Sequence, residues 1–482
     1  MQIVGLVGER GILPISQFLT SVHAEYGARA YWYFPTLLWF SRADAMLSIL
    51  CWGGAVLALL LVAGRAHVTV LVVLWAFYLS VTVAGQVFLG FQWDSLLLET
   101  GLLACLYVPL RAGAVPNGVV RWMLGGLAFK LTFLSGVTKI LSGDPAWAAW
   151  TAMTYHYETQ PIPAWTSWYV HQLPAAVHYG SVSAMLAVEI VAPFALLLPA
   201  RVRRTRLTAC IAMILLQVGI AITGNYGFFN LLTIALYVAA LDDDGLRGLW
   251  RLVRVRGVRL QPDQVRRVRL QADQSAGQPQ PGRADARLWR IGTTAAAIVL
   301  GVLSLGACIR EMELTARRST RIAGPWAVPL EWVGPFRAVN GYGLFRVMTR
   351  ERPEIVVEVS SDGQNWWEYE FRWKAGHPLR RPRFVQPHMP RLDWQMWFAA
   401  LHPPSAQYWL DRLTRQILAG EPSVLRLLGP SPLVNPPRYV RLAYYDYRFT
   451  TPEQRAETGG WWRRTFMAYL TEPIAAAPVP VP

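Results

Sequence analysis

Eight apolar segments of helix length limit this chain to folds in which many helices pack side by side. About 20 apolar residues span a bilayer at about 1.5 Å per residue. The eight segments lie roughly at 45–64, 68–89, 91–110, 119–141, 177–198, 207–224, 226–241 and 291–308. Hydrophobic residues make up 53% of the 482 positions and charged residues only 16%, which is too apolar for an ordinary soluble protein. The pattern predicts a polytopic α-helical membrane bundle of about eight spans.

Two arginine-rich stretches predict the orientation of the bundle. RVRRTR (201–206) separates the fifth and sixth apolar segments, and the stretch 242–290 holds eleven Arg against six Asp. Because Arg and Lys collect in cytoplasmic loops, both stretches are expected in the cytoplasm. The net charge of +16 is therefore not an indication of nucleic-acid binding. The chain would then begin outside the cytoplasm, which predicts that a first helix is missing upstream of this start.

The region after the last apolar segment has the pattern of a β-rich α+β domain outside the cytoplasm. EIVVEVSSDGQNWWEYEFRW predicts two strands joined by a hairpin at Asp362-Gly363, and residues 438–449 predict another strand. Residues 407–420 have helical spacing and end at a glycine. The predicted division is a bundle (1–241) with an extracytoplasmic loop (142–176), an Arg-rich cytoplasmic linker (242–290), a last transmembrane helix (291–308), the β-rich domain (309–473) and a disordered tail (474–482).

Two of the three lysines in the chain, Lys130 and Lys139, lie inside one apolar segment, 119–141. Ionisable groups at membrane depth are costly and usually face the interior of a bundle. Arg121 and Lys139 share a helix face about 27 Å apart along the axis, which predicts anchors at opposite interfaces. Lys130 lies midway between them and has no such route to water. It therefore needs an acidic partner.

Depth along antiparallel helices predicts these partners. Asp94 is expected at the level of Lys139, and Glu99 within about 6 Å of the level of Lys130. The predicted pairs are Asp94–Lys139 and Glu99–Lys130, with Glu189 in the fifth segment as a competing partner for Lys130. A buried lysine with a lowered pKa can act as a base, and an ion-paired lysine can be purely structural. The sequence leaves both interpretations of Lys130 open.

The loop 142–176 holds a polar and aromatic cluster around His156, Glu158 and Gln160. In an extended strand these three side chains share one face. They could form an acid–base pair, half of a metal site, or a packed cap on the bundle. One His and one Glu are too few for a zinc site, so the sequence predicts no metal site and no cofactor.

A second cluster lies in the expected β-rich domain, where Arg391 and Asp393 precede Trp394 and Trp397. On a helix these tryptophans and Phe398 share a face, which is typical of core packing. The other interpretation is an aromatic patch that docks a partner protein, because Trp, Tyr and Arg dominate interface hot spots.

Long strings of the chain resemble the lipase maturation factor family. The strings are FQWDSLLLETG, RWMLGGLAFKLTFLSGVTKI, TAMTYHYETQPIPAWTSWYVHQLP, NYGFFNLLTIAL and RLDWQMWFAAL. The resemblance implies a polytopic membrane protein, of the endoplasmic reticulum in animals, with a lumenal C-terminal domain and a role in folding secreted dimeric lipases. The chain is also faintly similar to the membrane domain of the vitamin K-dependent carboxylase. That similarity implies that a buried lysine, here Lys130, acts as a base. The enzyme hypothesis adds Glu99 and His156 as further catalytic residues.

The expected function is therefore a maturation factor for secreted lipases or other exported hydrolases. The alternative is an intramembrane enzyme of carboxylase-like type that uses Lys130, so whether the protein is an enzyme stays open. A transporter has no support from broken helices or paired repeats. The expected partners are the lipid bilayer and a lipase-like client. Arginine bias and repeats such as PVPVP favour a bacterial cytoplasmic membrane, with the endoplasmic reticulum membrane as the location in a eukaryote.

Overall fold

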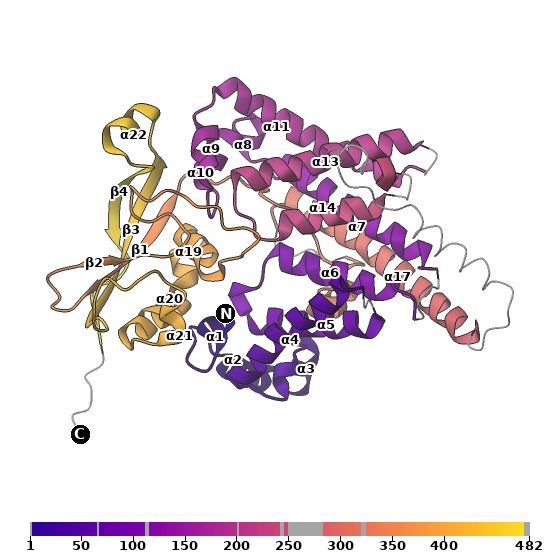
Figure 1. Ribbon diagram of the computed structural model, residues 1–482, viewed down its shortest axis with the longest axis horizontal. Helices are drawn as coiled ribbons and strands as arrows, with labels where there is room; N and C mark the ends of the chain where they lie inside the picture. The colour runs from indigo at the N-terminus through magenta and orange to yellow at the C-terminus, as the bar shows by residue number, and fades with distance from the viewer. Residues whose placement is uncertain are drawn as a thin grey trace.

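The computed structural model describes residues 2–64, 67–110, 115–199, 202–241, 245–248, 283–319 and 324–476. A helical bundle and a smaller module built on a β-sheet lie end to end (Figure 1). The linker predicted at 242–290 falls mainly outside the described residues. Its last residues belong to the helix that follows it, which begins at Arg283.

All eight predicted apolar segments form helices of the bundle. They are α4 (Asp44–Val62), α5 (Val68–Ala84), α6 (Gln92–Tyr107), α7 (Gly118–Leu141), α11 and α12 (Ala175–Ile190 and Phe194–Leu197), α13 (Arg203–Thr223), α14 (Phe229–Ala240) and α17 (Arg283–Ala316). Of the described helices, five are long and apolar enough to cross a membrane (α4, α7, α11 with α12, α13 and α17), and α5 and α14 are shorter apolar helices. The chain is an integral membrane protein with the predicted polytopic helical part.

Helix α7 is the centre of the bundle. It packs against α6, α11, α14 and α17, and most of its apolar window is buried inside the protein. Its start is fixed by Asn117, whose side chain accepts from Val119 N and donates to Thr293 and Thr294 of α17. Because neighbouring helices surround α7, its two lysines, Lys130 and Lys139, face protein.

The sheet module contains the predicted strands. Strands β1 (Pro353–Ser360), β2 (Trp367–Tyr369), β3 (Tyr439–Phe449) and β4 (Trp462–Tyr469) pair antiparallel in the order β2-β1-β3-β4. The predicted Asp362-Gly363 hairpin joins β1 to β2, and Gly363 has φ +76°, which favours glycine. Residues 474 and 475, predicted to begin a disordered tail, form the short strand β5 (Ile474–Ala475) against β3; residues 477–482 lie outside the described part.

Helices α19 (Arg391–Leu401), α20 (Pro403–Leu418) and α21 (Pro422–Leu425) cover one face of the sheet. Side chains that alternate along β1 and β3, such as Ile355, Val357 and Leu442, pack against Trp409 and Leu413 of α20. The helix predicted over 407–420 is confirmed as the second half of α20 and its glycine stop.

The start of the chain completes this same core. Helix α1 (Ile3–Val7) contributes Leu6, helix α2 (Ile15–Tyr26) contributes Leu19, and the connection between them contributes Ile12; all three are fully buried with the sheet residues. Helix α1 lies against α21 (Figure 1), and a Cβ on Gly5 would come within 2.3 Å of the Ser423 carbonyl oxygen. The module thus unites both ends of the chain, although sequence alone assigns residues 1–241 to the bundle.

The stretch after α17 returns to the bundle before the sheet begins. Helix α18 (Ala327–Val333) packs against α17, and the following residues, 338–348, run along α6, α7 and the loop after α7. Part of the predicted domain 309–473 therefore lies on the bundle rather than on the sheet.

Candidate functional site

Lys130 lies near the middle of α7 and forms the predicted pair with Glu99 of α6. Its Nζ donates to Glu99 Oε1 and, at 3.1 Å, to Ser304 Oγ of α17. Lys130 is 2% exposed and Glu99 is 3% exposed, so the pair is closed to solvent. The Glu99–Lys130 pair is confirmed, whereas Ser304 was missed because a serine on another helix carries no signal of its own.

The second oxygen of Glu99 holds the segment that follows α18. Oε2 accepts from Tyr342 Oη at 2.8 Å, from Asn340 Nδ2 at 3.1 Å and from the Asn340 backbone N at 3.2 Å. The Tyr342 ring also lies 5.3 Å from Lys130 Nζ. Every strong acceptor site of the Glu99 carboxylate is thus in use, which is how a buried charge is tolerated. This closed cluster joins α6, α7, α17 and the return segment.

The second lysine of α7 is also buried, which corrects its interpretation as an interfacial anchor. Lys139 is 4% exposed and donates to both carboxylate oxygens of Glu189 on α11, at 2.6 and 2.8 Å. A glycine one turn earlier permits this contact, since a Cβ on Gly136 would lie 2.9 Å from the Glu189 Cβ. Glu189 therefore pairs with Lys139 and not with Lys130. Arg121, at the other end of α7, is exposed and stays compatible with an anchor.

The predicted Asp94–Lys139 pair is wrong, because Asp94 binds an arginine from the sheet module. Arg391, at the start of α19, contacts both Asp94 carboxylate oxygens at 2.7 Å, and Tyr78 Oη donates to the same carboxylate at 2.6 Å. Asp94 is fully buried and Arg391 is 8% exposed. This bidentate pair fixes α19 to the beginning of α6.

Residues 152–159 form a helix, α9 (Ala152–Thr159), and not the extended strand in which His156, Glu158 and Gln160 would share one face. The helix ends before Pro161, whose ring disfavours helical backbone at the residue before it. Spacing of four residues brings His156 and Gln160 to one partner: Tyr226 Oη lies 3.2 Å from His156 Nε2 and donates to Gln160 Oε1 at 2.9 Å. Glu158 points elsewhere, so the three side chains do not share a face.

Glu158 belongs to the contact between the loop and the sheet module. It accepts from Arg448 Nη1 at 3.1 Å and from Phe449 N at 3.0 Å, both on β3, and lies 3.8 Å from His171 Nε2. Among the residues that the structure describes, no three His, Cys, Asp or Glu side chains gather as metal ligands. The polar cluster of the loop therefore positions the module.

Arg352 connects the loop 142–176 to the sheet, and it was not identified from the sequence. Its fully buried guanidinium donates to the carbonyl oxygens of Glu158 and Gln160 at 2.7 and 2.5 Å. It also pairs at 2.7 Å with Glu354, which binds Lys374 Nζ at 2.6 Å. The only hint in the sequence is that Arg352 and Glu354 lie on either side of Pro353, at the beginning of the first apolar strand.

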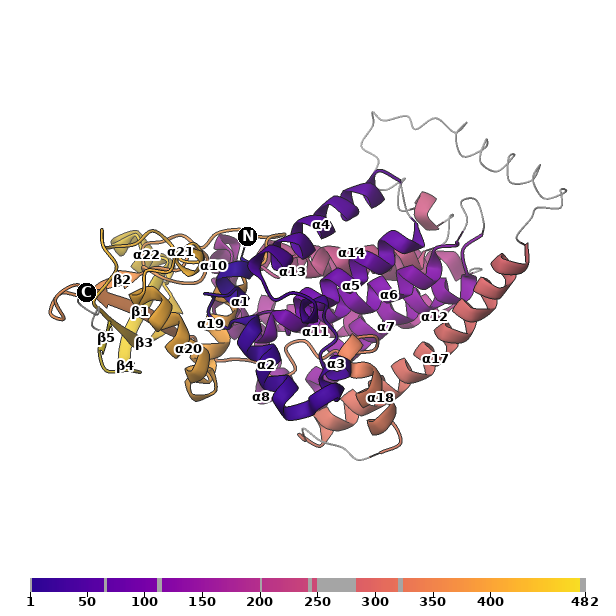
Figure 2. The same ribbon diagram turned by 90° about the horizontal axis from the view of Figure 1, so that it is seen from below.

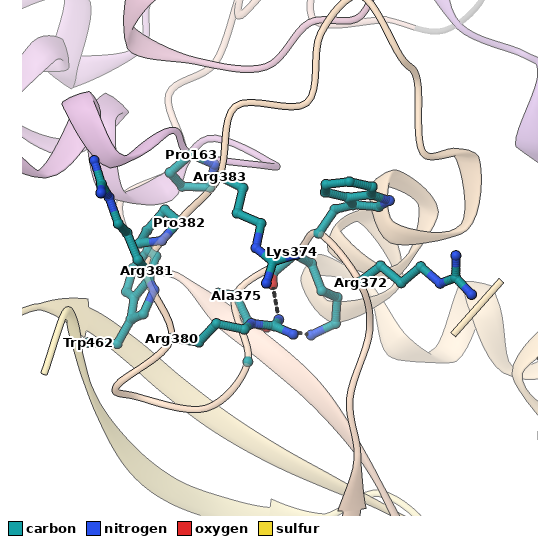
Figure 3. Close-up of a pocket in the computed structure, with 11 residues that line it drawn as sticks. Pro163, Arg372, Lys374, Ala375, Arg380, Arg381, Pro382, Arg383 and Trp462 are labelled. Carbon is teal, nitrogen blue, oxygen red and sulfur yellow. Dashed lines mark hydrogen bonds between the residues drawn. The ribbon is translucent and has the colours of Figure 1, made fainter. Parts of the chain in front are cut away.

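A basic loop covers this junction (Figure 3). Arg380 donates to the Lys374 carbonyl oxygen at 2.6 Å, and Arg381 lies over the Trp165 ring of the loop, 4.6 Å from its centroid. The space between these side chains holds only about 10 Å³, roughly one water molecule. The two arginines therefore hold the basic loop against the loop after α7, and the gap between them is too small for an organic ligand.

The tryptophans of α19 do not form an open docking patch. Trp394 is 4% exposed and packs on Trp93 of the bundle with ring centroids 4.7 Å apart, and Trp397 donates from Nε1 to the Thr159 carbonyl oxygen at 2.9 Å. Asp393 accepts from the backbone N of Lys374 at 2.9 Å. The interpretation as core packing is correct, although the core is the junction with the bundle.

Taken as a unit, the site is a junction of buried ion pairs between a membrane bundle and a sheet module. Two family models together match most of the chain: the lipase maturation factor transmembrane domain matches residues 1–248, and the lipase maturation factor C-terminal domain matches residues 338–471. The chain belongs to the lipase maturation factor family. Helix α17 lies between the two matched regions, although its Ser304 completes the Lys130 cluster.

Curated relatives extend over nearly the whole chain. Lipase maturation factor 2 of Homo sapiens is 36% identical, covering 97% of this chain and 78% of that protein. Lipase maturation factor 1 of Bos taurus is 34% identical, covering 98% of this chain and 84% of that protein. No solved structure matches the chain.

The junction predicts a pH effect that can be assigned to His156. Burial, with a smaller contribution from the Lys139 charge, lowers the pKa of His156 from 6.5 to about 4. Below about pH 6.5 the unfolded chain binds a proton that the folded chain excludes, so stability falls as the pH drops toward 4. We expect this to cost roughly 2–3 kcal/mol between about pH 7 and pH 4.5.

The measurement is thermal unfolding in neutral detergent micelles at both pH values. A His156→Gln variant should lose less stability than the native protein over this interval, by that same amount. His377, which is exposed on the sheet module, provides the control, since His377→Gln should leave the pH dependence unchanged. Equal pH dependence in the His156→Gln variant and the native protein would contradict the assignment.

Proposed function

We propose that this protein is a membrane-anchored maturation factor that assists the folding of secreted lipase-like hydrolases. Membership of the lipase maturation factor family supports the proposal, as do relatives named lipase maturation factors along most of the chain. The bundle would anchor the protein, and the sheet module would meet the client. The buried ion pairs of the junction would keep the module in a fixed position at one end of the bundle.

The observation that carries the proposal is an uncovered face of the sheet. We call it the outward aromatic face: Trp366, Arg441, Tyr445, Phe466 and Tyr469. Arg441 lies between the Trp366 and Tyr469 rings, 4.0 and 4.3 Å from their centroids. Phe466 is 47% exposed and Tyr469 is 50% exposed. Aromatic and arginine side chains held in place in this way are typical of protein-binding hot spots.

The client we propose is an extended apolar segment of an incompletely folded hydrolase. Strand β4 carries Phe466 and Tyr469 at the edge of the sheet, where its outer backbone groups can pair with an added strand. Such pairing is independent of sequence, whereas the aromatic side chains select apolar segments. Both properties suit a factor that meets clients before they are folded.

We place the sheet module on the non-cytoplasmic side of the membrane. Support comes from the arginines in the first turn of α13, a helix that begins at the end of the bundle opposite the module (Figure 1), since such residues favour the cytoplasm. The loop after α7 contacts the module through Glu158 and Arg448, which agrees with a common side for both. The membrane would be the cytoplasmic membrane of a bacterium, or that of the endoplasmic reticulum in a eukaryote.

The carboxylase-like alternative is not favoured. A catalytic base must reach a substrate, and Lys130 is sealed among Glu99, Ser304 and the Tyr342 ring. Lys130 lines neither the gap at the junction nor the cavity formed by Gln92, Arg310 and Asn340. The pair has the features of an architectural contact within the bundle.

The test is the yield of active secreted lipase from cells that lack the gene. Reintroducing the native protein should restore the yield, and the double variant Phe466→Ser, Tyr469→Ser should restore about tenfold less activity at equal protein level. Tyr408→Ser is the matched control, because Tyr408 is 51% exposed on α20 of the same module. Equal restoration by the double variant would exclude the face as the client site, and an unchanged yield in the deletion strain would exclude the function.

A further inference from the structure

A polar cavity of about 330 Å³ lies beside the Glu99 cluster and has no role in the junction. It is lined by the beginning of α6, the C-terminal part of α17, helix α18 and the return segment. Its polar lining comes from Gln92, Ser95, Arg310, Glu311, Arg337 and Asn340. The volume lies within the range of about 300–1,000 Å³ that is usual for small-ligand sites.

Two arginine side chains line this cavity without a protein partner. Within the described part of the chain, neither the Arg310 nor the Arg337 guanidinium has a hydrogen bond or ion pair, and the Arg310 Nε is buried and unsatisfied. Asp94, whose charge acts on Arg337, is already bound by Arg391. The buried Nε of Arg310 is a donor without an acceptor, which costs free energy that a bound anion would recover, whereas Arg337 is exposed.

The acidic residue in the lining does not cancel this charge. Glu311 Oε1 lies 3.3 Å from Arg346 Nη1, so its carboxylate already has a counter-ion. Because Arg346 neutralises Glu311, the charges of Arg310 and Arg337 give the cavity a net charge of two positive units. The site is therefore suited to a group with one or two negative charges.

The cavity lies at the level of the membrane interface. Arg310 follows the last apolar segment by two residues, and α18 beside it exposes Val328 and Trp332, 64% and 61%. Trp332 meets Trp32 of the N-terminal region with ring centroids 5.5 Å apart, where α18 and α3 (Ala30–Tyr33) lie side by side (Figure 2). Exposed tryptophans beside the end of a span are typical of the headgroup region.

We propose that this cavity binds the phosphate group of a phospholipid headgroup. Arg310 and Arg337 would hold the phosphate oxygens through paired N–H groups, a geometry that arginine provides and lysine does not. Phe91, Leu314 and Leu330 of the same lining would contact the glycerol and the first acyl carbons. The inference is independent of the proposed function, since the outward aromatic face lies on the other part of the molecule.

The experiment uses the full chain in a neutral detergent and measures binding of three probes by calorimetry. The probes are dioctanoyl phosphatidylglycerol, dioctanoyl phosphatidylcholine and inorganic phosphate. We expect phosphatidylglycerol to bind most tightly, because it keeps its net negative charge. Arg310→Gln and Arg337→Gln should each weaken its binding about 10- to 100-fold. Arg317→Gln is the control, since Arg317 is an exposed residue next to the end of α17 and does not line the cavity.

The outcomes separate the lipid from free phosphate. Inorganic phosphate that binds as tightly as phosphatidylglycerol and displaces it would overturn the lipid as the source of the phosphate. Unchanged binding in both glutamine variants, or equal weakening in Arg317→Gln, would overturn the site itself. If Arg310→Gln fails to fold, Arg310→Lys decides: it keeps the charge and should fold, but it should bind phosphatidylglycerol more weakly than the native protein because it loses the paired N–H groups.

Discussion

Replacing Arg391 by methionine is expected to lower the free energy of unfolding by about 3–5 kcal/mol, because it leaves a buried carboxylate without its counter-ion. Asp94 is fully buried and would keep only the hydroxyl of Tyr78 as a strong donor. The same change should loosen the sheet module from the bundle, since the pair joins α19 to α6. Thermal unfolding in detergent micelles measures the first effect, and the rate of protease cleavage in the loop 372–383 measures the second.

Arg412→Met is the matched control for this change. Arg412 lies on the next helix, α20, is exposed and makes one hydrogen bond, to Gln17 at 2.6 Å. Exposed polar contacts contribute about 1 kcal/mol or less, so its loss should be small. Equal melting temperatures for Arg391→Met and Arg412→Met would show that the Asp94–Arg391 pair does not hold the junction.

The second large effect is expected at Lys130. Lys130→Met leaves Glu99 charged inside the bundle and should also cost about 3–5 kcal/mol. Removing both charges in Lys130→Met, Glu99→Leu should recover most of this loss, because a buried pair can be replaced by apolar side chains at little cost. Arg121→Met, on an exposed face of the same helix, should change the stability by less than about 1 kcal/mol.

Thermal unfolding of the native protein, Lys130→Met, Glu99→Leu and the double variant in one detergent gives the coupling energy between Lys130 and Glu99. A double variant that is less stable than either single variant would contradict an architectural pair. Such a result would mean that Glu99 stabilises the fold mainly through its hydrogen bonds with Asn340 and Tyr342, which donate to its second oxygen, and not through its ion pair with Lys130.

The parts of the fold that sequence predicts well depend on distances along one helix or strand. Depth in the membrane follows from a fixed rise per residue, which is why the Glu99–Lys130 pair was found. The Asp362-Gly363 hairpin follows from local turn chemistry, which needs no distant contact. Both features are present in the structure.

The wrongly predicted ion pairs depend on which helices lie side by side, and the depth of a residue in the membrane does not determine this. Asp94 and Lys139 lie at the same end of the bundle, as expected, but their partners are Arg391 and Glu189. Arg391 is almost 300 residues from Asp94 in sequence, and only the docking of the sheet module brings it there. A glycine at position 136, which lets α11 approach α7, was the one available clue to the Lys139–Glu189 pair.

The aromatic residues show the same limit. Trp394 and Trp397 have the helical spacing of a packed face, and spacing alone does not say whether that face meets the chain itself or a partner. The exposed face of the sheet carries Phe466 and Tyr469 on the edge strand β4. Their sequence pattern does not differ from that of an ordinary strand, so it does not indicate that these side chains are exposed. The alternation of polar side chains over 155–160 is compatible with an extended strand, but the proline after Gln160 is equally compatible with the helix end that the structure shows.

The most direct test of the account is the activity of Lys130→Arg in cells. Arginine keeps the positive charge that Glu99 requires but does not lose its proton, so it supports a structural pair and not a catalytic base. In the deletion strain, this variant should restore the yield of active secreted lipase to the native level for each folded molecule. A Lys130→Arg protein that is present, folded and inactive would contradict the account and would identify Lys130 as a group that must exchange a proton.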